Sequence, residues 1–376
     1  MLSPALSVLA LLAGLSFTCS QNAEAGEPLT SSDAFSRDLP GAVVHVGVFG
    51  LFHPRQLRLS APDGHALILH AGEERLVLEK SSGVDSANLS VSEKDIAVTA
   101  RTRVVQALSL TVTGRKNEPT DFILAVPGKI KRHYHGMLRV EQSAGSLIAI
   151  VDMDREIAVA SVVAAESGPD TPIEALKAQA VAARSYFAAS RGRHADFDFC
   201  DTTHCQFLRE PPPAQSLAVK AVSATSDLVL AYDAHPFAAM YTRSCGGKTH
   251  TPAELSIPST IYPYFSVECK YCREHPARWS SRIPSTAAAA LRSSDESARL
   301  GVDRRLGWSA VPSNDFTVKK ENDQFILNGT GQGHGIGLCQ AGAKAMAEEG
   351  ADYRKILSHY YPNTTIVPLP AHPASE

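Results

Sequence analysis

Four potential metal ligands fall within one short segment of the chain. They are two imidazoles and two thiols, carried by His194, Cys200, His204 and Cys205. Zinc in proteins is bound by four nitrogen and sulfur ligands in a tetrahedron, and this segment offers one complete set. Because four protein ligands leave no open position for water, we expect such an ion to be structural. The alternatives are a disulfide between the two cysteines and an unrelated group of polar loop residues.

A carboxylate stands at the end of an apolar run. Glu166 follows Ala160–Ala165, and Ser167–Pro169 breaks the chain after it. A carboxyl group beside so much apolar surface is partly desolvated, which raises its pKa toward neutral pH. Such a group can donate a proton to a leaving oxygen and later accept one. The alternative is an ordinary surface glutamate at a helix end, or one paired with Arg184.

An alanine-rich helix is predicted after this glutamate. The segment Thr171–Glu174 fits a capping box, with Thr at the N-cap, Pro at the first helical position and Glu at the third. The helix then runs from Ala175 to about Ser190. One buried face is predicted from apolar residues at helical spacing: Ile173, Leu176, Ala180, Ala183 and Phe187. Arg184 lies on this helix, where it could pair with Glu166 or bind a substrate oxygen; a solvated helix face is the alternative.

Glycines mark two other segments that could contact a ligand. Ser244–Lys248 contains adjacent glycines, which let a backbone approach a ligand closely. Gly331–Gly337 has glycine at every second position around His334. The third glycine of a dinucleotide-binding motif is missing in every register. We therefore expect a flat wall, poor in side chains, that suits a bulky ligand such as a sugar chain.

The remaining cysteines allow several arrangements. Cys245 could be a nucleophile with His334 as its base, a packed thiol, or the disulfide partner of Cys339. The pair Cys269 and Cys272, with two residues between them, is either a strained local disulfide or half of a second metal site. Spacing alone leaves these alternatives open.

Two regions of different character make up the 376 residues. Short runs of branched residues from Val43 to about Asp152 predict strands, and we assign a β-rich accessory region to residues 42–134. The rest mixes helices and strands, so the predicted fold class is α+β. Residues 273–300 predict a surface insertion, and a helix is expected from about Leu338 to Glu349. The net charge of −3 provides no basic field for a polyanion, so no nucleic acid partner is expected.

The N-terminus has the features of an export signal. Ala5–Phe17 is apolar but too short to span a bilayer, and Ala23–Ala25 supplies a small-x-small cleavage site. We therefore expect residues 1–25 to be a signal peptide, followed by a polar leader at 26–41. Lipoprotein cleavage before Cys19 is the alternative, although the residues preceding it are larger than such cleavage favours.

Six segments, taken together, match the pattern of one known family. They are Val163–Glu166, Glu174–Tyr186, Cys200–Gln206, Ser244–Thr249, Gly333–Ala343 and His359–Pro362. In this order they resemble the stage II sporulation protein D family, also called the SpoIID/LytB domain. The resemblance covers the predicted catalytic domain, residues 135–366, and leaves 367–376 as a tail. The family usually has Met-Ser-Gln where this chain has Leu338–Gln340. The additional cysteine, Cys339, keeps a disulfide near the active site among the alternatives.

The resemblance implies an exported lytic transglycosylase of bacterial cell-wall glycan. Such enzymes cut the β-1,4 bond between N-acetylmuramic acid and N-acetylglucosamine without water and leave a 1,6-anhydro sugar. Glu166 falls on the family's catalytic glutamate, which is acid to the glycosidic oxygen and then base to the muramic 6-hydroxyl. Arg184 matches a position that lines the same site. The implied substrate contacts are Ser244, Lys248, His334 and Gln340.

The resemblance also implies a metal and partners. The cluster at residues 194–205 matches those members that carry Cys and His in this loop, so zinc is implied, without a part in the chemistry. Peptidoglycan glycan strands are the implied partner. Some relatives are described as enhancers that stimulate a cell-wall amidase. A non-catalytic, glycan-binding regulator of such an amidase is therefore the alternative function.

Overall fold

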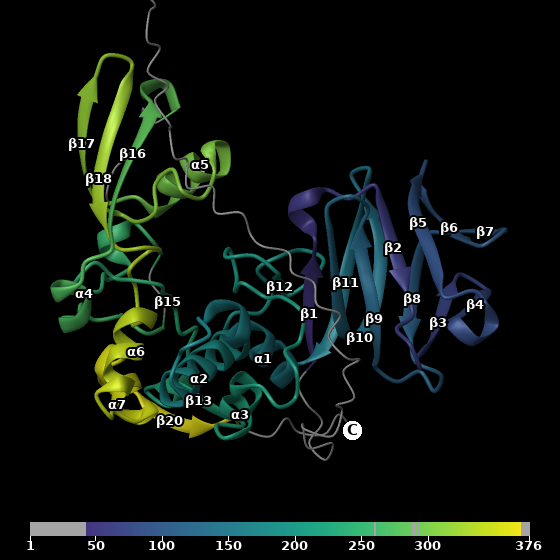
Figure 1. The fold of residues 1–376 in the computed structure, drawn as a ribbon, viewed down its shortest axis with the longest axis horizontal. Helices are drawn as coiled ribbons and strands as arrows, with labels where there is room; N and C mark the ends of the chain where they lie inside the picture. The colour runs from purple at the N-terminus through teal and green to yellow at the C-terminus, as the bar shows by residue number, and fades with distance from the viewer. Residues whose placement is uncertain (1–42, 259–260, 288–290, 292–293, 370–376) are drawn as a thin grey trace, which may run out of the picture.

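The computed structural model describes residues 43–258, 261–287, 291 and 294–369. The chain forms a strand-rich part, a helical part and a small three-stranded lobe (Figure 1). The lobe is inserted within the helical part, because the chain returns to the helical part after it. This arrangement confirms the predicted α+β class. The predicted signal peptide, the polar leader and Cys19 lie outside the described residues. In the described part of the chain, no helix combines the length and apolar character that a membrane span requires.

The strand-rich part is a twelve-stranded sheet. Its strands are β1 (Val43–Val48), β2 (Gln56–Ser60), β3 (Ala66–Ala71), β4 (Glu74–Glu79), β5 (Ser86–Ser92), β6 (Asp95–Ala100), β7 (Arg103–Ala107), β8 (Ser109–Thr113), β9 (Thr120–Val126), β10 (Ile130–Ser143), β11 (Ser146–Asp154) and β12 (Phe199–Cys200). The main path runs β12-β1-β11-β10-β9-β2-β5-β6-β7, while β3 pairs with β4 and β8, and β8 pairs with β10. Alternate residues of β9 and β10 are buried, as the period of a strand requires.

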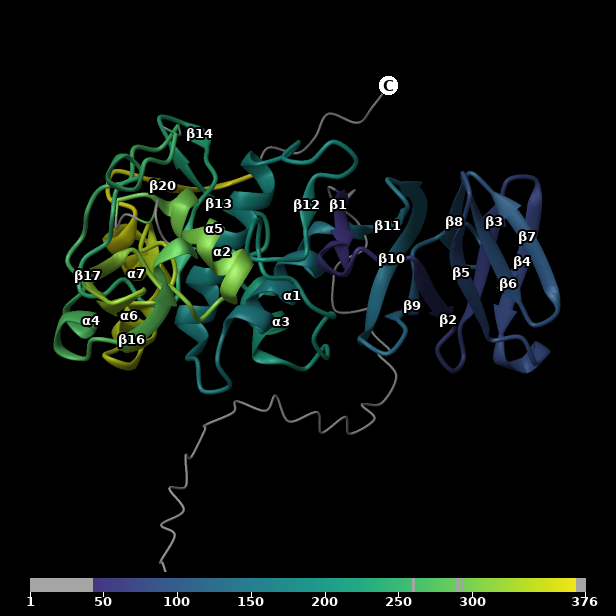
Figure 2. The same cartoon turned by 90° about the horizontal axis from the view of Figure 1, so that it is seen from above.

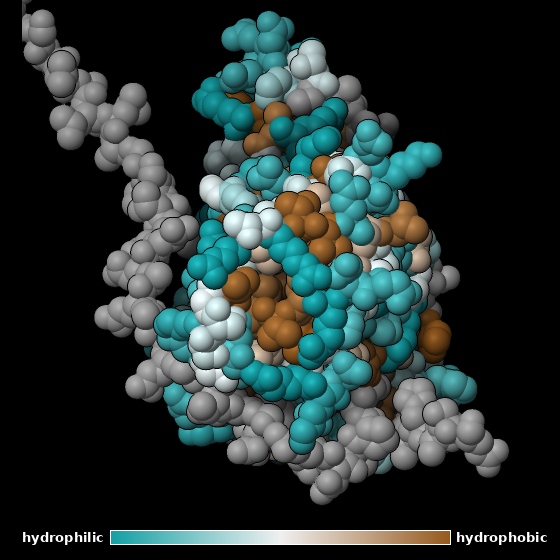
Figure 3. All heavy atoms as spheres, turned by 90° about the vertical axis from the view of Figure 1, so that its right-hand side faces the viewer, coloured by the Kyte–Doolittle hydropathy of each residue, from teal (hydrophilic) through white to brown (hydrophobic). Residues whose placement is uncertain are grey.

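The predicted domain boundary between residues 134 and 135 falls inside β10, so it does not separate two structural parts. The strand-rich part continues through β11 to Asp154. Its far end, around β5–β7, is drawn in Figure 3, where hydrophobic residues gather inside a hydrophilic rim. Val104 on β7 and Leu108 after it are 61% and 74% exposed. This end lies opposite the helical part, away from the site described below (Figure 1).

Helix α1 (Arg155–Glu166) begins directly after β11. The carboxylate of Asp154 caps it by accepting the backbone N–H groups of Glu156 at 2.7 Å and Ile157 at 3.2 Å. Helix α2 (Ile173–Ala189) packs against α1, α3 (Leu217–Ser223) and β13 (Leu228–Tyr232). It is buried along both its predicted apolar face and its alanine-rich side. Small side chains allow this, because they let several neighbours approach one helix closely.

The predicted capping box at the start of α2 is wrong. Pro172 occupies the N-cap position, and its side chain makes no capping hydrogen bond. The hydroxyl of Thr171 donates to the carbonyl of Gly168 at 2.8 Å, and Glu174 accepts the backbone N–H of Tyr353 at 2.9 Å. A tertiary contact with the helix at Tyr353–Tyr360 thus replaces the local bond that the sequence suggested.

The helical part is completed by the C-terminal segments. Its remaining strands and helices are β14 (His235–Pro236), β15 (Tyr241–Thr242), α4 (Lys270–Glu274), β19 (Leu338–Cys339), α6 (Gln340–Glu348), α7 (Tyr353–Tyr360) and β20 (Thr365–Pro368). β13 lies between β14 and β20, and β15 runs parallel to β19. The helix predicted from Leu338 therefore starts two residues later, after a short strand. Figure 2 shows the helical and strand-rich parts at opposite ends of the molecule.

The predicted surface insertion at 273–300 is only the first half of an ordered lobe. Its elements are β16 (Arg278–Pro284), α5 (Glu296–Leu306), β17 (Asp315–Glu321) and β18 (Gln324–Thr330). The strands form an antiparallel sheet in the order β16-β18-β17. The lobe has its own small core of Ile283, Val302, Val311 and Leu327. Single-turn 3-10 helices occupy connections throughout the chain: η2 (Gly50–Phe52), η3 (Lys80–Ser82), η4 (Ala253–Leu255) and η5 (Ser285–Ala287).

Candidate active site

Glu166 is the last residue of α1, and its side chain is half-buried. The backbone N–H of Phe207 donates to its Oε1 at 3.2 Å, and the side-chain amide of Gln340 lies near enough to favour its ionised form. Desolvation raises the pKa of Glu166, although Phe207, Arg243 and Gln340 each lower it. The shift has the direction that the apolar surroundings suggested. It favours proton transfer closer to neutral pH than an ordinary glutamate allows.

Three separate segments bring these partners to Glu166. Phe207 follows residues 194–205, which carry the two histidines and two cysteines and are called the His–Cys loop below. Arg243 follows β15, and Gln340 is the first residue of α6. Arg243 also donates to the backbone carbonyl of Glu166 at 3.4 Å. The Nε2 of Gln340 donates to Oε1 of Gln179 on α2 at 3.4 Å. The Gln340 amide therefore links α2 to the candidate catalytic carboxyl group.

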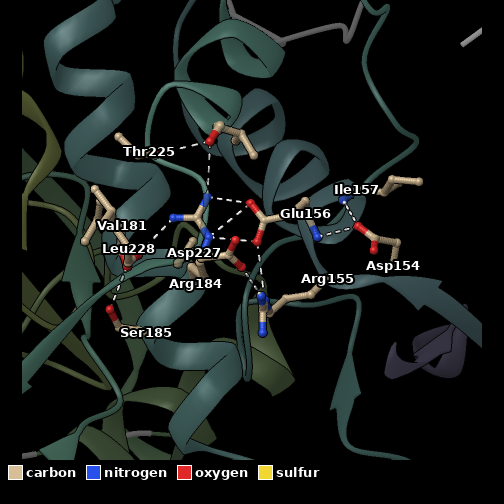
Figure 4. Close-up of polar contacts among 12 residues, drawn as sticks. Asp154, Arg155, Glu156, Ile157, Val181, Arg184, Ser185, Thr225, Asp227 and Leu228 are labelled. Atoms are coloured by element: carbon tan, nitrogen blue, oxygen red, sulfur yellow. Dashed lines mark hydrogen bonds and ion pairs between the residues drawn. The ribbon is translucent and has the colours of Figure 1, made fainter. Parts of the chain in front are cut away.

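Arg184 binds Glu156 rather than Glu166 (Figure 4). Its Nε donates to the two carboxylate oxygens of Glu156 at 2.8 Å and 3.0 Å, and its Nη2 donates to one of them at 2.6 Å. Its Nη1 donates to the carbonyl of Leu228 at 3.0 Å. The arginine is 0% exposed and paired with Glu156, which corrects the expected pair with Glu166 and the alternative of a solvated helix face. Arg184 instead ties α2 to the first turn of α1, the helix that ends at Glu166.

The four predicted metal ligands converge. Ligand atoms of His194, Cys200, His204 and Cys205 lie within 4.8 Å of one another. Nε2 of His194 is 3.3 Å from Sγ of Cys205, and Nδ1 of His204 is 3.6 Å and 3.8 Å from the sulfurs of Cys205 and Cys200. Zinc bonded to nitrogen and sulfur at about 2.0–2.3 Å gives tetrahedron edges of roughly 3.3–3.8 Å. The donor set and its spacing therefore fit this ion, and both thiols are free.

Strand β1 holds the His–Cys loop in place. The carboxylate of Asp201 accepts the backbone N–H of Phe49 at 3.2 Å and the guanidinium of Arg132 at 2.9 Å. A Cβ atom on Gly47 would lie 2.5 Å from the ring of Phe197, so glycine is needed where the loop crosses the strand. No local sequence pattern indicates these contacts, because they join residues that are far apart along the chain.

The predicted substrate contacts lie in different surroundings. Lys248 is exposed and lines a surface pocket of about 330 Å³. Burial lowers the pKa of His334 to about 4, and its Nδ1 accepts the backbone N–H of Ile336 at 3.0 Å. The neutral ring therefore carries its proton on Nε2. Ser244 is 7% exposed, and its Oγ lies 3.4 Å from Sγ of Cys272, so the structure places it against buried cysteines.

Four other cysteines form a second cluster. The sulfurs of Cys245, Cys269, Cys272 and Cys339 lie within 4.8 Å of one another, and all four thiols are free. Neither of the two disulfides considered as alternatives is therefore formed. The other alternative, half a metal site at Cys269 and Cys272, is completed by two further potential ligands, Cys245 and Cys339. Only the spacing of those two residues pointed to it in the sequence.

The region that contains this site is similar to known proteins. The family model SpoIID, Stage II sporulation protein, matches residues 143–232, which include Glu166, α2 and the His–Cys loop. An uncharacterized protein of Brachyspira hyodysenteriae is 29% identical over 267 residues, which cover 62% of this chain and 72% of that protein. Stage II sporulation protein D of Bacillus amyloliquefaciens is 28% identical over 255 residues, which cover 55% of this chain and 72% of that protein.

A shorter match points to a relative with a different name. The amidase enhancer of Bacillus subtilis is 48% identical over 61 residues, which cover 16% of this chain and 9% of that protein. The fold and site define an α+β protein with a half-buried acid beside a cluster of potential metal ligands. The family match over residues 143–232 and the stage II sporulation relatives support a SpoIID family assignment, in agreement with the resemblance seen in the sequence.

Proposed function

We propose that the protein is a peptidoglycan lytic transglycosylase in which Glu166 is the single acid and base. The proposal is supported by the family assignment and by one observation above all. Glu166 is a half-buried carboxyl group with a raised pKa, and hydrogen-bond donors from two other segments reach it. A group of this kind stays protonated closer to neutral pH than an ordinary glutamate, as a general acid must.

The proposed reaction uses the carboxyl group twice. Glu166 first donates its proton to the glycosidic oxygen between N-acetylmuramic acid and N-acetylglucosamine. The bond from C1 to this oxygen breaks, and its electron pair leaves with the oxygen. The carboxylate then removes the proton of the muramic 6-hydroxyl, whose oxygen bonds to C1. The products are a 1,6-anhydro end and a new 4-hydroxyl group, and Glu166 is protonated again.

The surroundings of Glu166 suit both protonation states. Desolvation favours the acid, while the N–H of Phe207, the amide of Gln340 and the charge of Arg243 favour the carboxylate that exists between the two steps. Glycosidases that use water or a covalent intermediate need a second carboxylate. In the proposed reaction the sugar supplies its own nucleophile, so donors around one carboxyl group are sufficient.

Other residues would bind and orient the glycan. The pocket at Lys248 is also lined by Gly246, Gly247 and Arg273, and by the carboxylates Glu254, Glu268 and Asp315. It therefore offers groups of both charges, and its two glycines make part of its surface poor in side chains. His334 would act as a neutral donor through Nε2. Zinc bound at the His–Cys loop would stabilise the loop that carries Phe207, because four protein ligands leave no position for a reacting water.

The proposed substrate implies a location. Peptidoglycan lies outside the cytoplasmic membrane, so we propose that residues 1–25 direct export to the periplasm or an equivalent compartment. Lipid anchoring through Cys19 is the alternative. The mass of the mature N-terminus tests this, since cleavage after Ala25 and lipidation of Cys19 give different peptides.

Digestion of purified glycan strands tests the activity. The mature protein and Glu166→Gln are incubated with peptide-bearing and with denuded strands, and the fragments are analysed by mass spectrometry. We expect anhydro-ended fragments from the wild type alone. Fragments with a reducing-end hydroxyl would mean hydrolysis by a water-activating group, and would contradict the proposed reaction.

The second candidate function is a non-catalytic enhancer of a cell-wall amidase. It is favoured by the 48% identical segment shared with the amidase enhancer of Bacillus subtilis. An amidase assay with and without the protein separates the two functions. Stimulation that is equal for the wild type and Glu166→Gln, without glycan cleavage by either, would support the enhancer.

A further inference from the structure

We propose that Cys245, Cys269, Cys272 and Cys339 form a second zinc site, closed to solvent and separate from the His–Cys loop. The proposal stands on the arrangement of the four sulfurs and does not depend on the proposed enzymatic activity. Three segments that are distant in sequence meet at this point. Cys245 follows β15, Cys269 and Cys272 belong to the first turn of α4, and Cys339 ends β19.

The spacing of the sulfurs selects a single ion. All four lie within 4.8 Å of one another, and Cys272 and Cys339 are 3.5 Å apart. Zinc bonded to four sulfurs at about 2.3 Å gives tetrahedron edges of roughly 3.8 Å. A disulfide would instead bring two sulfurs to about 2.05 Å. A four-iron cluster would hold the sulfurs further apart, because its irons and sulfides lie between them.

Burial and hydrogen bonding suit four thiolates. The cysteines are 0% to 3% exposed. The backbone N–H of Gly342 donates to the sulfur of Cys339 at 3.5 Å, and the hydroxyls of Tyr360 and Ser244 lie 3.4 Å from the sulfurs of Cys269 and Cys272. Such donors offset the negative charge that four thiolates keep around one divalent ion, as the outer contacts of metal sites do.

The wall of the cluster is built closely around the sulfurs. A Cβ atom on Gly342 would lie 2.0 Å from the hydroxyl of Tyr360 and 2.6 Å from the sulfur of Cys269. Glycine is therefore required where α6 passes the cluster. Four protein sulfurs fill the tetrahedron, so the zinc would be structural and would join α4, β15 and the start of α6.

Metal analysis of the full-length, purified protein tests this site. We expect two zinc ions per chain in the wild type and one in the double variant His194→Ala/Cys205→Ser, which removes the first site. X-ray absorption at the zinc edge then reads the ligands of the remaining ion. Four sulfurs around it are expected in this variant, whereas two nitrogens and two sulfurs would come from the first site.

The reverse variant and a thiol count complete the test. Cys272→Ser is expected to lose one zinc and to keep an ion with two nitrogen and two sulfur ligands. If Cys272→Ser fails to fold, the double variant still decides the question. A double variant without zinc would overturn the proposal, and so would iron in place of the zinc in that variant. A disulfide between two of these four cysteines, mapped in the metal-free protein, would also overturn it.

Discussion

The backbone N–H of Phe207 lies 3.2 Å from Oε1 of Glu166, and Phe207 is two residues beyond Cys205. The loop that gathers the His–Cys ligands therefore also places a donor on the candidate catalytic carboxyl group. Gln340 stands in a similar relationship to the second cluster, because it follows Cys339 directly and its side chain lowers the pKa of the same carboxyl group. Each cysteine cluster is thus adjacent in sequence to a group that contacts Glu166.

Cys205→Ser tests the first of these connections. With one sulfur ligand removed, we expect the ion at the His–Cys loop to be lost, the melting temperature to fall, and glycan cleavage to drop by about 10- to 100-fold as Phe207 loses its position. Zinc content, thermal unfolding and the fragment assay measure these effects. Thr203→Ala, an exposed change in the same loop, is the control. Unchanged metal content in Cys205→Ser would rule out a metal site there.

Glu166→Gln should separate activity from stability. Loss of a general acid and base lowers the rate by about 10²- to 10⁴-fold. Since desolvation raises the pKa of Glu166 above 4.5, the folded wild type loses stability as pH rises from 4.5 through the raised value. The glutamine variant has no such loss. The melting temperature of Glu166→Gln, compared with that of the wild type, should therefore gain nothing below pH 4.5 and rise above it. A difference that shrinks with rising pH would contradict this.

Local patterns predicted more of this site than of the fold around it. The His–Cys ligands and the carboxyl at Glu166 could be identified because each signal lies in one short segment. The Cys245 cluster could not, since its sulfurs come from three distant segments. The pair of Arg184 and Glu156 was missed for a similar reason: spacing shows that a cation lies in a helix, but not which carboxylate it meets.

Arg184→Met should affect stability more than substrate binding. It removes the bidentate partner of the largely buried Glu156 and leaves it only the contact with Arg155, and breaking such a pair costs up to about 3–5 kcal/mol of the free energy of unfolding. Adding Glu156→Leu should recover much of this loss, because no buried charge then stays unpaired. Lys177→Met is the control, since it breaks a partly exposed pair with Glu174 worth about 0–1 kcal/mol. Denaturant unfolding measures all four proteins.

For Arg184→Met we expect a lower free energy of unfolding. The affinity of the folded fraction for glycan should be unchanged. A stable variant that binds glycan poorly would instead mean that Arg184 contacts the substrate, as the family resemblance implied.

His334 should make the protein sensitive to acid. Its pKa is lowered from 6.5 to about 4 in the folded state, so the unfolded chain binds a proton there before the folded chain does. Stability is therefore lost as pH falls from 6.5 toward 4. In His334→Gln this part of the loss should disappear, while glycan affinity falls if Nε2 is a substrate donor. The pH dependence of the melting temperature of the two proteins checks the first effect, and parallel curves would contradict it.

The contact between the end of β1 and the His–Cys loop also determines when the candidate site can form during folding. Asp201 meets the backbone of Phe49 across 152 residues of sequence. Contacts of such long range form late, because the entropy of closing the intervening chain must be overcome first. A chain that leaves the ribosome with β1 exposed must therefore wait for more than a hundred further residues before its candidate active site is complete. We expect unfinished and truncated chains to be inactive for this reason, which would protect the cell wall from them.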